Sequence, residues 1–155
     1  MKELIMLAGL PGSGKSTWAK EYKNRMTGAD RNAVQIVSTD EIRKELWGDA
    51  ADQQNGAKVF EVAYQRIEFW LSSPYCDTVI FDATNLHKKD RKRFLNKFGI
   101  MADTKLVWFD TPYTECVRRN FQRERNVPTA VIQRMFEHMD VPTLDEGFDE
   151  YTVVY

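Results

Sequence analysis

A glycine-rich loop near the N-terminus is the feature of this sequence with the clearest chemistry. Residues 9–16 read Gly-Leu-Pro-Gly-Ser-Gly-Lys-Ser and satisfy the pattern G-x-x-x-x-G-K-[ST] in full. Glycines let the backbone curl so that successive N–H groups point at one anion. Lys15 can then reach the β- and γ-phosphates of a nucleotide, and the Ser16 hydroxyl can bind Mg²⁺. We therefore expect ATP (or another NTP) and Mg²⁺ at a site formed by Pro11, Gly12, Ser13, Gly14, Lys15, Ser16 and Thr17.

The sequence on both sides of the loop supports this interpretation. The apolar run 4–8 before it is typical of a buried strand, and residues 17–22 after it resemble the opening of a helix. A helix that begins at the loop adds the positive end of its dipole to the anion site. A glycine turn that matches the pattern by chance is the alternative, and it leaves both flanks unexplained.

Asp40 follows a second predicted strand and is a candidate general base. A hydroxyl that attacks a γ-phosphate must lose its proton, and a carboxylate in line with the phosphoryl group can accept it. Arg43 lies three residues later, on the same face of a helix, and can hold a phosphate on the acceptor. A simple helix cap is the alternative role for Asp40.

Asp82 ends the apolar run 79–81 and is a second carboxylate at a strand end. It can orient Mg²⁺ through water, or it can position Arg43 or Asn85. The remaining alternative is a polar turn residue that only ends the strand.

Residues 118–125 contain four arginines just before Val127 and Pro128. We expect a helical, arginine-rich lid over about residues 113–128, which includes Arg119 and Arg123. Such a lid can close over the transferring phosphates and stabilise their developing charge. A solvated helix end, where cations also favour the dipole, is the alternative.

Strands alternate with helices along the whole chain. The central strands are continuous apolar runs, as expected where both faces of a sheet are covered. The pattern predicts an α/β fold of three layers with a five-stranded parallel sheet, and aromatic residues at periodic positions should belong to its core. The expected strands are 3–8, 34–38, 78–82, 105–109 and 151–154. The expected helices are 15–26, 39–47 (capped by Ser38 or Thr39), 57–71, 87–98, 113–123 (with Thr111 as the cap and Pro112 in the first turn) and one after Pro128.

Composition narrows the class of protein. The chain has 155 residues, of which 43% are hydrophobic and 29% charged, so we expect one soluble globular domain over residues 1–155. No apolar run approaches the roughly 18 residues of a membrane span, so no membrane partner is expected. Two cysteines make no disulfide framework, and a cytoplasmic location is the default.

The net charge of −1 hides a local asymmetry. Residues 86–125 contain eleven Lys/Arg and five Asp/Glu, whereas residues 126–155 contain one Arg and six Asp/Glu. A nearly neutral protein is not expected to bind long nucleic acid by charge alone. The basic middle can still hold a nucleotide and the end of a strand, although most basic helices such as 88–97 are only solvated faces.

The chain resembles the kinase domain of phage polynucleotide 5′-hydroxyl kinase and related small P-loop kinases of the zeta-toxin and adenylate-kinase-like group. The resemblance covers nearly the whole chain and rests on GLPGSGKSTW (9–18), STDEIR (38–43), DATNL (82–86), RNFQR (119–123) and Val127-Pro128, with Pro142-Thr143 and residues 146–149 at its end. In one departure, Ala83 stands where the phage kinase has aspartate, and Asp82 lies one residue earlier.

The resemblance implies roles for individual residues. Lys15 and Ser16 match the phosphate and metal residues, and Asp40 matches the general base. Arg43 matches the arginine on the acceptor side, and Arg123 matches the lid arginine on the donor phosphates.

The function expected is ATP-dependent phosphorylation of a hydroxyl, with the 5′-hydroxyl of an RNA or DNA end as the favoured acceptor. A sugar, a nucleotide sugar, an antibiotic or an aminoacyl-tRNA is the alternative acceptor. A non-catalytic nucleotide-binding protein is the alternative from another class. A guanine-nucleotide switch is disfavoured because Asn96-Lys97-Phe98-Gly99 lacks the aspartate of N-K-x-D.

Overall fold

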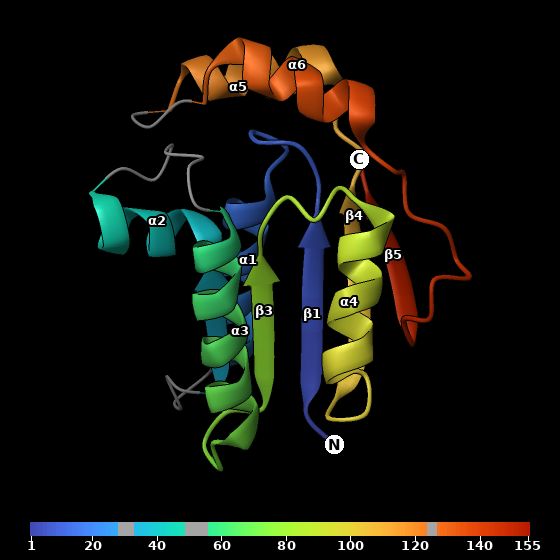
Figure 1. Ribbon diagram of the computed structural model, residues 1–155. Coiled ribbons are helices and arrows are strands. Elements are labelled where there is room, and N and C mark those ends of the chain that lie inside the picture. The colour runs from blue at the N-terminus through green and yellow to red at the C-terminus, as the bar shows by residue number, and fades with distance from the viewer. Residues whose placement is uncertain (28–32, 49–55, 124–126) are drawn as a thin grey trace.

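A computed structural model describes residues 1–27, 33–48, 56–123 and 127–155 of the protein. Five parallel strands form one sheet in the order β2-β3-β1-β4-β5, with β1 at its centre (Figure 1). The strands are β1 (Glu3–Ala8), β2 (Val34–Ser38), β3 (Thr78–Asp82), β4 (Asp103–Phe109) and β5 (Glu150–Val154). The predicted α/β fold with a five-stranded parallel sheet is therefore confirmed.

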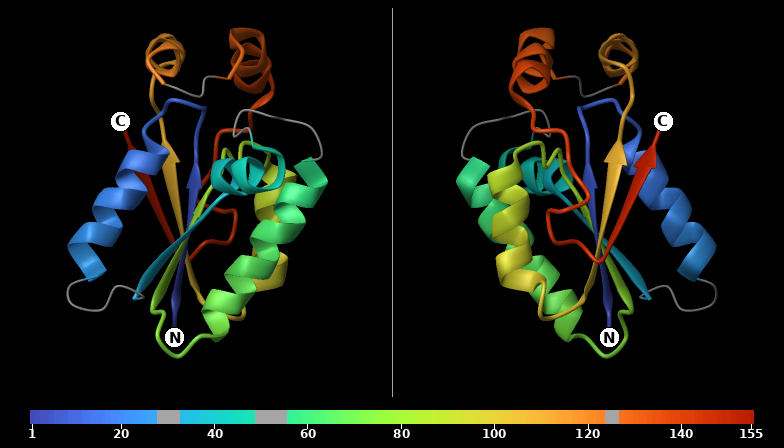
Figure 2. Two further views of the ribbon diagram at one scale, coloured as in Figure 1. Left: turned by 90° about the vertical axis from the view of Figure 1, so that its left-hand side faces the viewer. Right: turned by 90° about the vertical axis from the view of Figure 1, so that its right-hand side faces the viewer.

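Helices cover both faces of this sheet and the carboxyl ends of its strands. Helix α1 packs on one face and α3 and α4 on the other, while α5 and α6 lie beyond the carboxyl ends of the strands (Figures 1 and 2). The helices are α1 (Lys15–Thr27), α2 (Thr39–Trp47), α3 (Gly56–Ser72), α4 (Lys88–Phe98), α5 (Tyr113–Phe121) and α6 (Thr129–His138). None of the helices described is long and apolar enough to cross a membrane.

Successive side chains of each strand point to opposite faces of the sheet, so each face has its own hydrophobic core. In β1, Leu4 and Met6 join the core beneath α3 and α4, whereas Ile5 and Leu7 join the core beneath α1. All four are essentially inaccessible to solvent. Because both faces are covered, the central strands contain runs of consecutive apolar residues, 4–8 in β1, 79–81 in β3 and 106–109 in β4. Cys76 and Cys116 are buried free thiols.

The predicted elements differ from the observed ones by at most two residues at either end, and α5 shows the informative difference. It ends at Phe121 instead of Arg123. The Asn120 side chain donates to the Val127 carbonyl (2.6 Å) and accepts from the Val127 N–H (3.0 Å). This pair of bonds ties the end of α5 to the segment before α6, so Arg123 lies outside the helix. The predicted lid residues 124–126 lie outside the described residues.

The predicted cap of α5 is also wrong. The residue at the N-cap position is Pro112, which has no side-chain capping bond. Thr111 instead donates its hydroxyl to the Ser13 carbonyl at 2.9 Å. A threonine hydroxyl has one proton to donate, and here that proton braces the glycine-rich loop.

Candidate active site

The glycine-rich loop connects β1 to α1 and packs closely against α5. Gly12 and Gly14 adopt φ values of +81° and +103°, which side chains rarely tolerate. A Cβ atom on Gly12 would lie 2.5 Å from the carbonyl oxygen of Cys116 in α5. Glycine at position 12 is therefore required both for the turn and for the approach of α5 to the loop.

Lys15 is buried at the start of α1, with its ammonium group inside the loop. Its Nζ donates to the carbonyls of Gly9 (2.9 Å) and Leu10 (2.8 Å) and to Ser13 Oγ (3.4 Å). Burial lowers the pKa of Lys15, and the Asp82 carboxylate opposes that shift. An anion at this position would stabilise the charged form of the lysine.

Ser16 and Asp82 meet across the loop. Ser16 Oγ donates to Asp82 Oδ2 at 2.7 Å, and Thr39 Oγ1 donates to the Asp82 backbone carbonyl at 3.5 Å. Burial raises the pKa of Asp82, while Lys15 and the Ser16 hydrogen bond oppose the shift. Oxygen atoms of this kind are the ligands that Mg²⁺ prefers.

The described residues contain no cluster of three or more His, Cys, Asp and Glu side chains that could hold a metal. A Mg²⁺ ion held by Ser16 and Asp82 would therefore take its other ligands from water and phosphate oxygens, as is usual for this ion. The residues present fit an ion of that type. Asn85 does not compete for Asp82, because its amide donates to the carbonyls of Leu7 (2.7 Å) and Ala83 (3.5 Å).

Asp40 lies in the first turn of α2 between two arginines. Arg43 Nη1 is 3.4 Å from Asp40 Oδ1, and Arg123 Nη2 is 3.4 Å from Asp40 Oδ2. Ser38 occupies the N-cap position and accepts from the Glu41 N–H at 3.3 Å. The capping role considered for Asp40 is therefore wrong. Its carboxylate is about a third exposed and lines the cavity described below.

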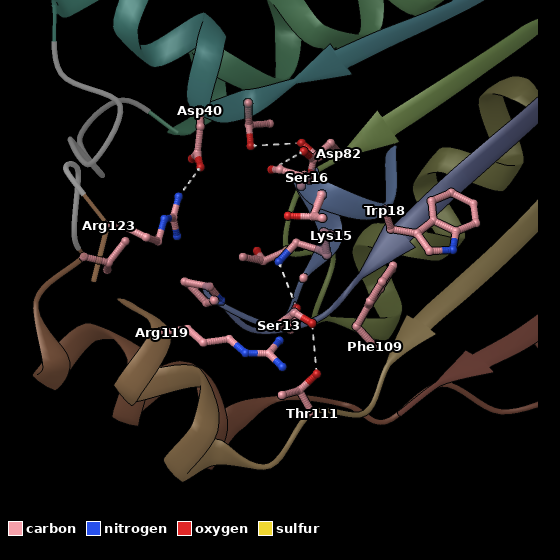
Figure 3. Close-up of a pocket in the computed structure, with 18 of the residues that line it drawn as sticks. Ser13, Lys15, Ser16, Trp18, Asp40, Asp82, Phe109, Thr111, Arg119 and Arg123 are labelled. Carbon is pink, nitrogen blue, oxygen red and sulfur yellow. Dashed lines mark hydrogen bonds and ion pairs between the residues drawn. The ribbon is translucent and has the colours of Figure 1, made fainter. Parts of the chain in front are cut away.

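The arginine-rich segment divides between the cavity and the outer surface. Arg118 and Arg119 both pair with Glu115, at 2.5 Å and 2.9 Å, and these hydrogen bonds lower the pKa of Glu115 to about 2. Arg119 and Arg123 line the cavity and Arg118 does not. Figure 3 shows Arg119 and Arg123 on one side, facing Asp40 and Lys15.

A single cavity of about 620 Å³ joins these groups at the carboxyl ends of the strands, where parallel α/β sheets bind ligands. The structure thus brings together every predicted site residue. Those lining the cavity are Pro11, Gly12, Ser13, Gly14, Lys15, Ser16, Thr17, Asp40, Arg43, Asp82, Arg119 and Arg123.

Sequence reasoning missed several residues of this cavity, among them Trp18, Phe109 and Thr111. Trp18 and Phe109 were expected only in the core, yet they also form one wall, with their rings edge to face at 6.1 Å (Figure 3). Thr111 lines the cavity beside them. The positions of Phe109 and Thr111 at the end of β4 were the available signal, since strand ends at this edge surround the ligand.

Comparisons with known proteins agree with the geometry. The chain is 28% identical to L-seryl-tRNA(Sec) kinase of Methanococcus maripaludis over 155 residues, covering 94% of this chain and 56% of that protein. In the structure of the Pnkp1/Rnl/Hen1 RNA repair complex, one chain is 26% identical with a TM-score of 0.64, covering 90% of this chain and 46% of that one. This chain therefore spans about half the length of both relatives.

A third similarity concerns the fold alone. Kti12 of Chaetomium thermophilum, solved in complex with ADP-AlF3, has a TM-score of 0.74 at 16% identity, covering 97% of this chain and 88% of that one. The sequence model of the AAA_33 family, described as an AAA domain, matches residues 4–142. With that match over most of its length and a complete phosphate-binding loop, the chain belongs to the AAA_33 family of small P-loop kinases.

Proposed function

We propose that this protein transfers the γ-phosphate of ATP to the 5′-hydroxyl of an RNA or DNA end. The single observation that carries the proposal is the position of Asp40, held between Arg43 and Arg123 in the cavity that also contains the phosphate loop. A protein that only binds nucleotide has no use for a carboxylate at this place. Residues 1–155 act as one kinase unit in this proposal, with residues 113–128 as its lid.

The glycine-rich loop binds ATP, the phosphate donor. Backbone N–H groups of residues 12–16 and the Lys15 ammonium bind the phosphates, and Ser16 and Asp82 hold Mg²⁺. The ion supplies charge stabilisation to the phosphate oxygens. Trp18 and Phe109 form one wall of the cavity and offer aromatic surface to the nucleoside part of ATP.

Helix α2 carries the residues that act on the acceptor. Asp40 accepts the proton of the 5′-hydroxyl while that oxygen forms a bond to the γ-phosphorus. The bond between the γ-phosphorus and the β–γ bridging oxygen breaks, and ADP leaves with that electron pair. Arg43 orients the acceptor beside Asp40, and Arg119 and Arg123 stabilise the charge on the transferring phosphoryl group.

The choice of a nucleic-acid acceptor is supported by similarity. The resemblance to polynucleotide 5′-hydroxyl kinases includes Asp40, Arg43 and Arg123, and a relative belongs to an RNA repair complex. The similarity to L-seryl-tRNA(Sec) kinase favours a second candidate, phosphorylation of the seryl hydroxyl of an aminoacyl-tRNA. Both candidates use the same donor site and the same base.

The test offers γ-labelled ATP and Mg²⁺ with 5′-hydroxyl RNA, 5′-hydroxyl DNA and seryl-tRNA as separate acceptors. We expect label on the 5′ ends, and a loss of about 10²- to 10⁴-fold in kcat for Asp40→Asn with unchanged ATP affinity. Glu41→Gln is the matched control, since this neighbouring carboxylate lies outside the cavity lining. Full activity of Asp40→Asn would refute the base.

Label on seryl-tRNA alone would replace the polynucleotide acceptor with the second candidate. Binding of ATP without label on any of the three acceptors would refute both candidates and leave a small-molecule hydroxyl as the acceptor. The two arms thus separate the chemistry of Asp40 from the identity of the acceptor.

A further inference from the structure

A second cavity of about 350 Å³ lies between α3 and α4, and the reaction as described above does not use it. Figures 1 and 2 show these two helices side by side on one face of the sheet. Its volume falls in the range of small-molecule sites, which begins at about 300 Å³. The residues that line it are Ala57, Phe60, Glu61, Tyr64, Asn85, Asp90 and Arg93.

The two cavities are neighbours. Phe60 lines both of them. The segment after β3 also passes from one to the other, because residues 82–84 line the first cavity and Asn85 lines the second. A molecule whose hydroxyl lies at Asp40 therefore has a second place, beside Phe60, for the part of it that does not react.

The aromatic rings of the second cavity are held in place by the core. Phe60 meets Phe81 of β3 edge to face, with centroids 6.0 Å apart. Tyr64 packs edge to face on Phe98 of α4 at 5.1 Å and on Phe94 at 6.2 Å. Rings fixed in this way lose little freedom when a flat ligand stacks on them, so the surface is preorganised for a heterocycle.

A cation borders the same cavity. Arg93 of α4 is 70% exposed, and its ion pair with Asp90 spans 3.9 Å within one helical turn. Exposed pairs of this kind contribute little, so exchange of Asp90 for a phosphate has a small cost. Lys89 and Lys92 are exposed on the same helix. Part of the basic run 88–97 is thereby placed beside a cavity with aromatic walls.

We propose that the second cavity binds the nucleobase of the acceptor nucleotide, stacked on Phe60 and Tyr64, and that Arg93 binds the phosphodiester that follows it. This proposal rests on the proposed function and deepens it, because it identifies a nucleobase-bearing acceptor as the substrate class. An aromatic ring beside an arginine is the combination that binds single-stranded nucleic acid. A sugar or other acceptor without a base would leave the cavity unfilled.

The first test compares two acceptors, a 5′-hydroxyl oligonucleotide and the same oligonucleotide with an abasic 5′-terminal residue. We expect wild-type kcat/KM to be about tenfold higher for the acceptor with the base, since one base–aromatic stack contributes on that order. Phe60→Leu should reduce this ratio toward one. Phe69→Leu is the matched control, on α3 but exposed and outside both cavities.

The second test needs no turnover. Binding of a 5′-hydroxyl dinucleotide to the protein without ATP should weaken about tenfold in Phe60→Leu and should become less salt-dependent in Arg93→Gln, but not in Lys92→Gln. Dinucleotide binding that depends on Phe60, without transfer to any 5′ end, would refute the proposed function and support the subsite. Equal kcat/KM for both acceptors, with dinucleotide binding insensitive to Phe60, would refute the subsite alone.

Discussion

Lys15 and Asp82 are two buried groups whose charged forms are both disfavoured by their surroundings. Each charge partly offsets the desolvation of the other, and each also has hydrogen bonds, from Lys15 to the loop and from Ser16 to Asp82. The proposed triphosphate with Mg²⁺ would bring negative charge to the lysine and positive charge to the carboxylate. The site is thus poised so that the ligand supplies the counter-charges that the protein itself leaves incomplete.

A pH dependence of ATP affinity follows from Lys15. Burial holds its pKa below the ordinary 10.5, and phosphate oxygens at Nζ raise it again, so binding takes up a proton between the two pKa values. We therefore expect ATP affinity to fall as the pH rises through the lowered pKa, by up to about tenfold per pH unit. Calorimetry in two buffers of different ionisation enthalpy measures both the affinity and the proton uptake.

Two lysine variants complete that measurement. The residual ATP binding of Lys15→Met should lose the alkaline pH dependence, whereas Lys20→Met, on the exposed surface of α1, should retain it. A wild-type affinity that stays constant up to pH 10.5 would contradict the assignment of the proton to Lys15.

At the scale of elements, the contact between the glycine-rich loop and α5 joins the donor site to the arginines. The loop approaches α5 at Gly12, and Thr111, just before that helix, donates to the Ser13 carbonyl. Arg119 and Arg123 follow on or just beyond the same helix and line the cavity. A displacement of α5 therefore moves the loop and the arginines together.

Gly12 and Gly48 have similar backbone conformations, so alanine substitutions at the two positions separate the effect of conformation from the effect of packing. Gly48→Ala at φ +75° meets nothing within 4 Å, so we expect a loss of about 1 kcal/mol in the free energy of unfolding. Gly12→Ala at φ +81° must also displace the Cys116 carbonyl. It should lose more stability than Gly48→Ala and should weaken ATP binding at least tenfold. Urea unfolding and ATP titration measure the two effects, and equal stabilities would show that α5 yields freely.

At the scale of the molecule, buried Arg91 links the loop after β3 to residues 49 and 55 positions further along the chain. Its guanidinium pairs with Glu146 through two bonds, Nε to Oε1 at 2.7 Å and Nη2 to Oε2 at 3.0 Å. It also donates to the carbonyls of Asn85 (2.9 Å) and Asp140 (3.0 Å). One side chain of α4 thereby holds the loop after β3, which carries the site, against the segment between α6 and β5.

Removal of this link should be strongly destabilising. Arg91→Met leaves the Glu146 carboxylate buried without its counter-charge, so we expect a loss of about 3–5 kcal/mol in the free energy of unfolding. Lys105→Met is the control, because its pairs with Glu3 and Glu150 are partly exposed and should contribute about 1 kcal/mol or less. Equal effects in denaturant titrations would refute the structural importance of Arg91.

The sequence by itself determined the parts of this protein that short-range patterns encode. Residues 9–16 match a pattern whose glycines are required by backbone conformation or by close packing, and the strand and helix beside it follow from apolar periodicity. The sequence also predicted that polar side chains lie together at one end of the sheet, because parallel strands have their carboxyl ends on the same side. The five strands and the ring of cavity residues were predictable for these reasons.

The tertiary structure alone decided which of those side chains meet. Asp40 and Arg123 are 83 positions apart, and Ser16 and Asp82 are 66 apart. Thr111, expected to cap α5, instead reaches Ser13 across 98 positions. Such pairs depend on strand register and on how α5 packs against the loop, and no local pattern encodes these. For the same reason, only the folded chain places Phe60 on two adjoining cavities.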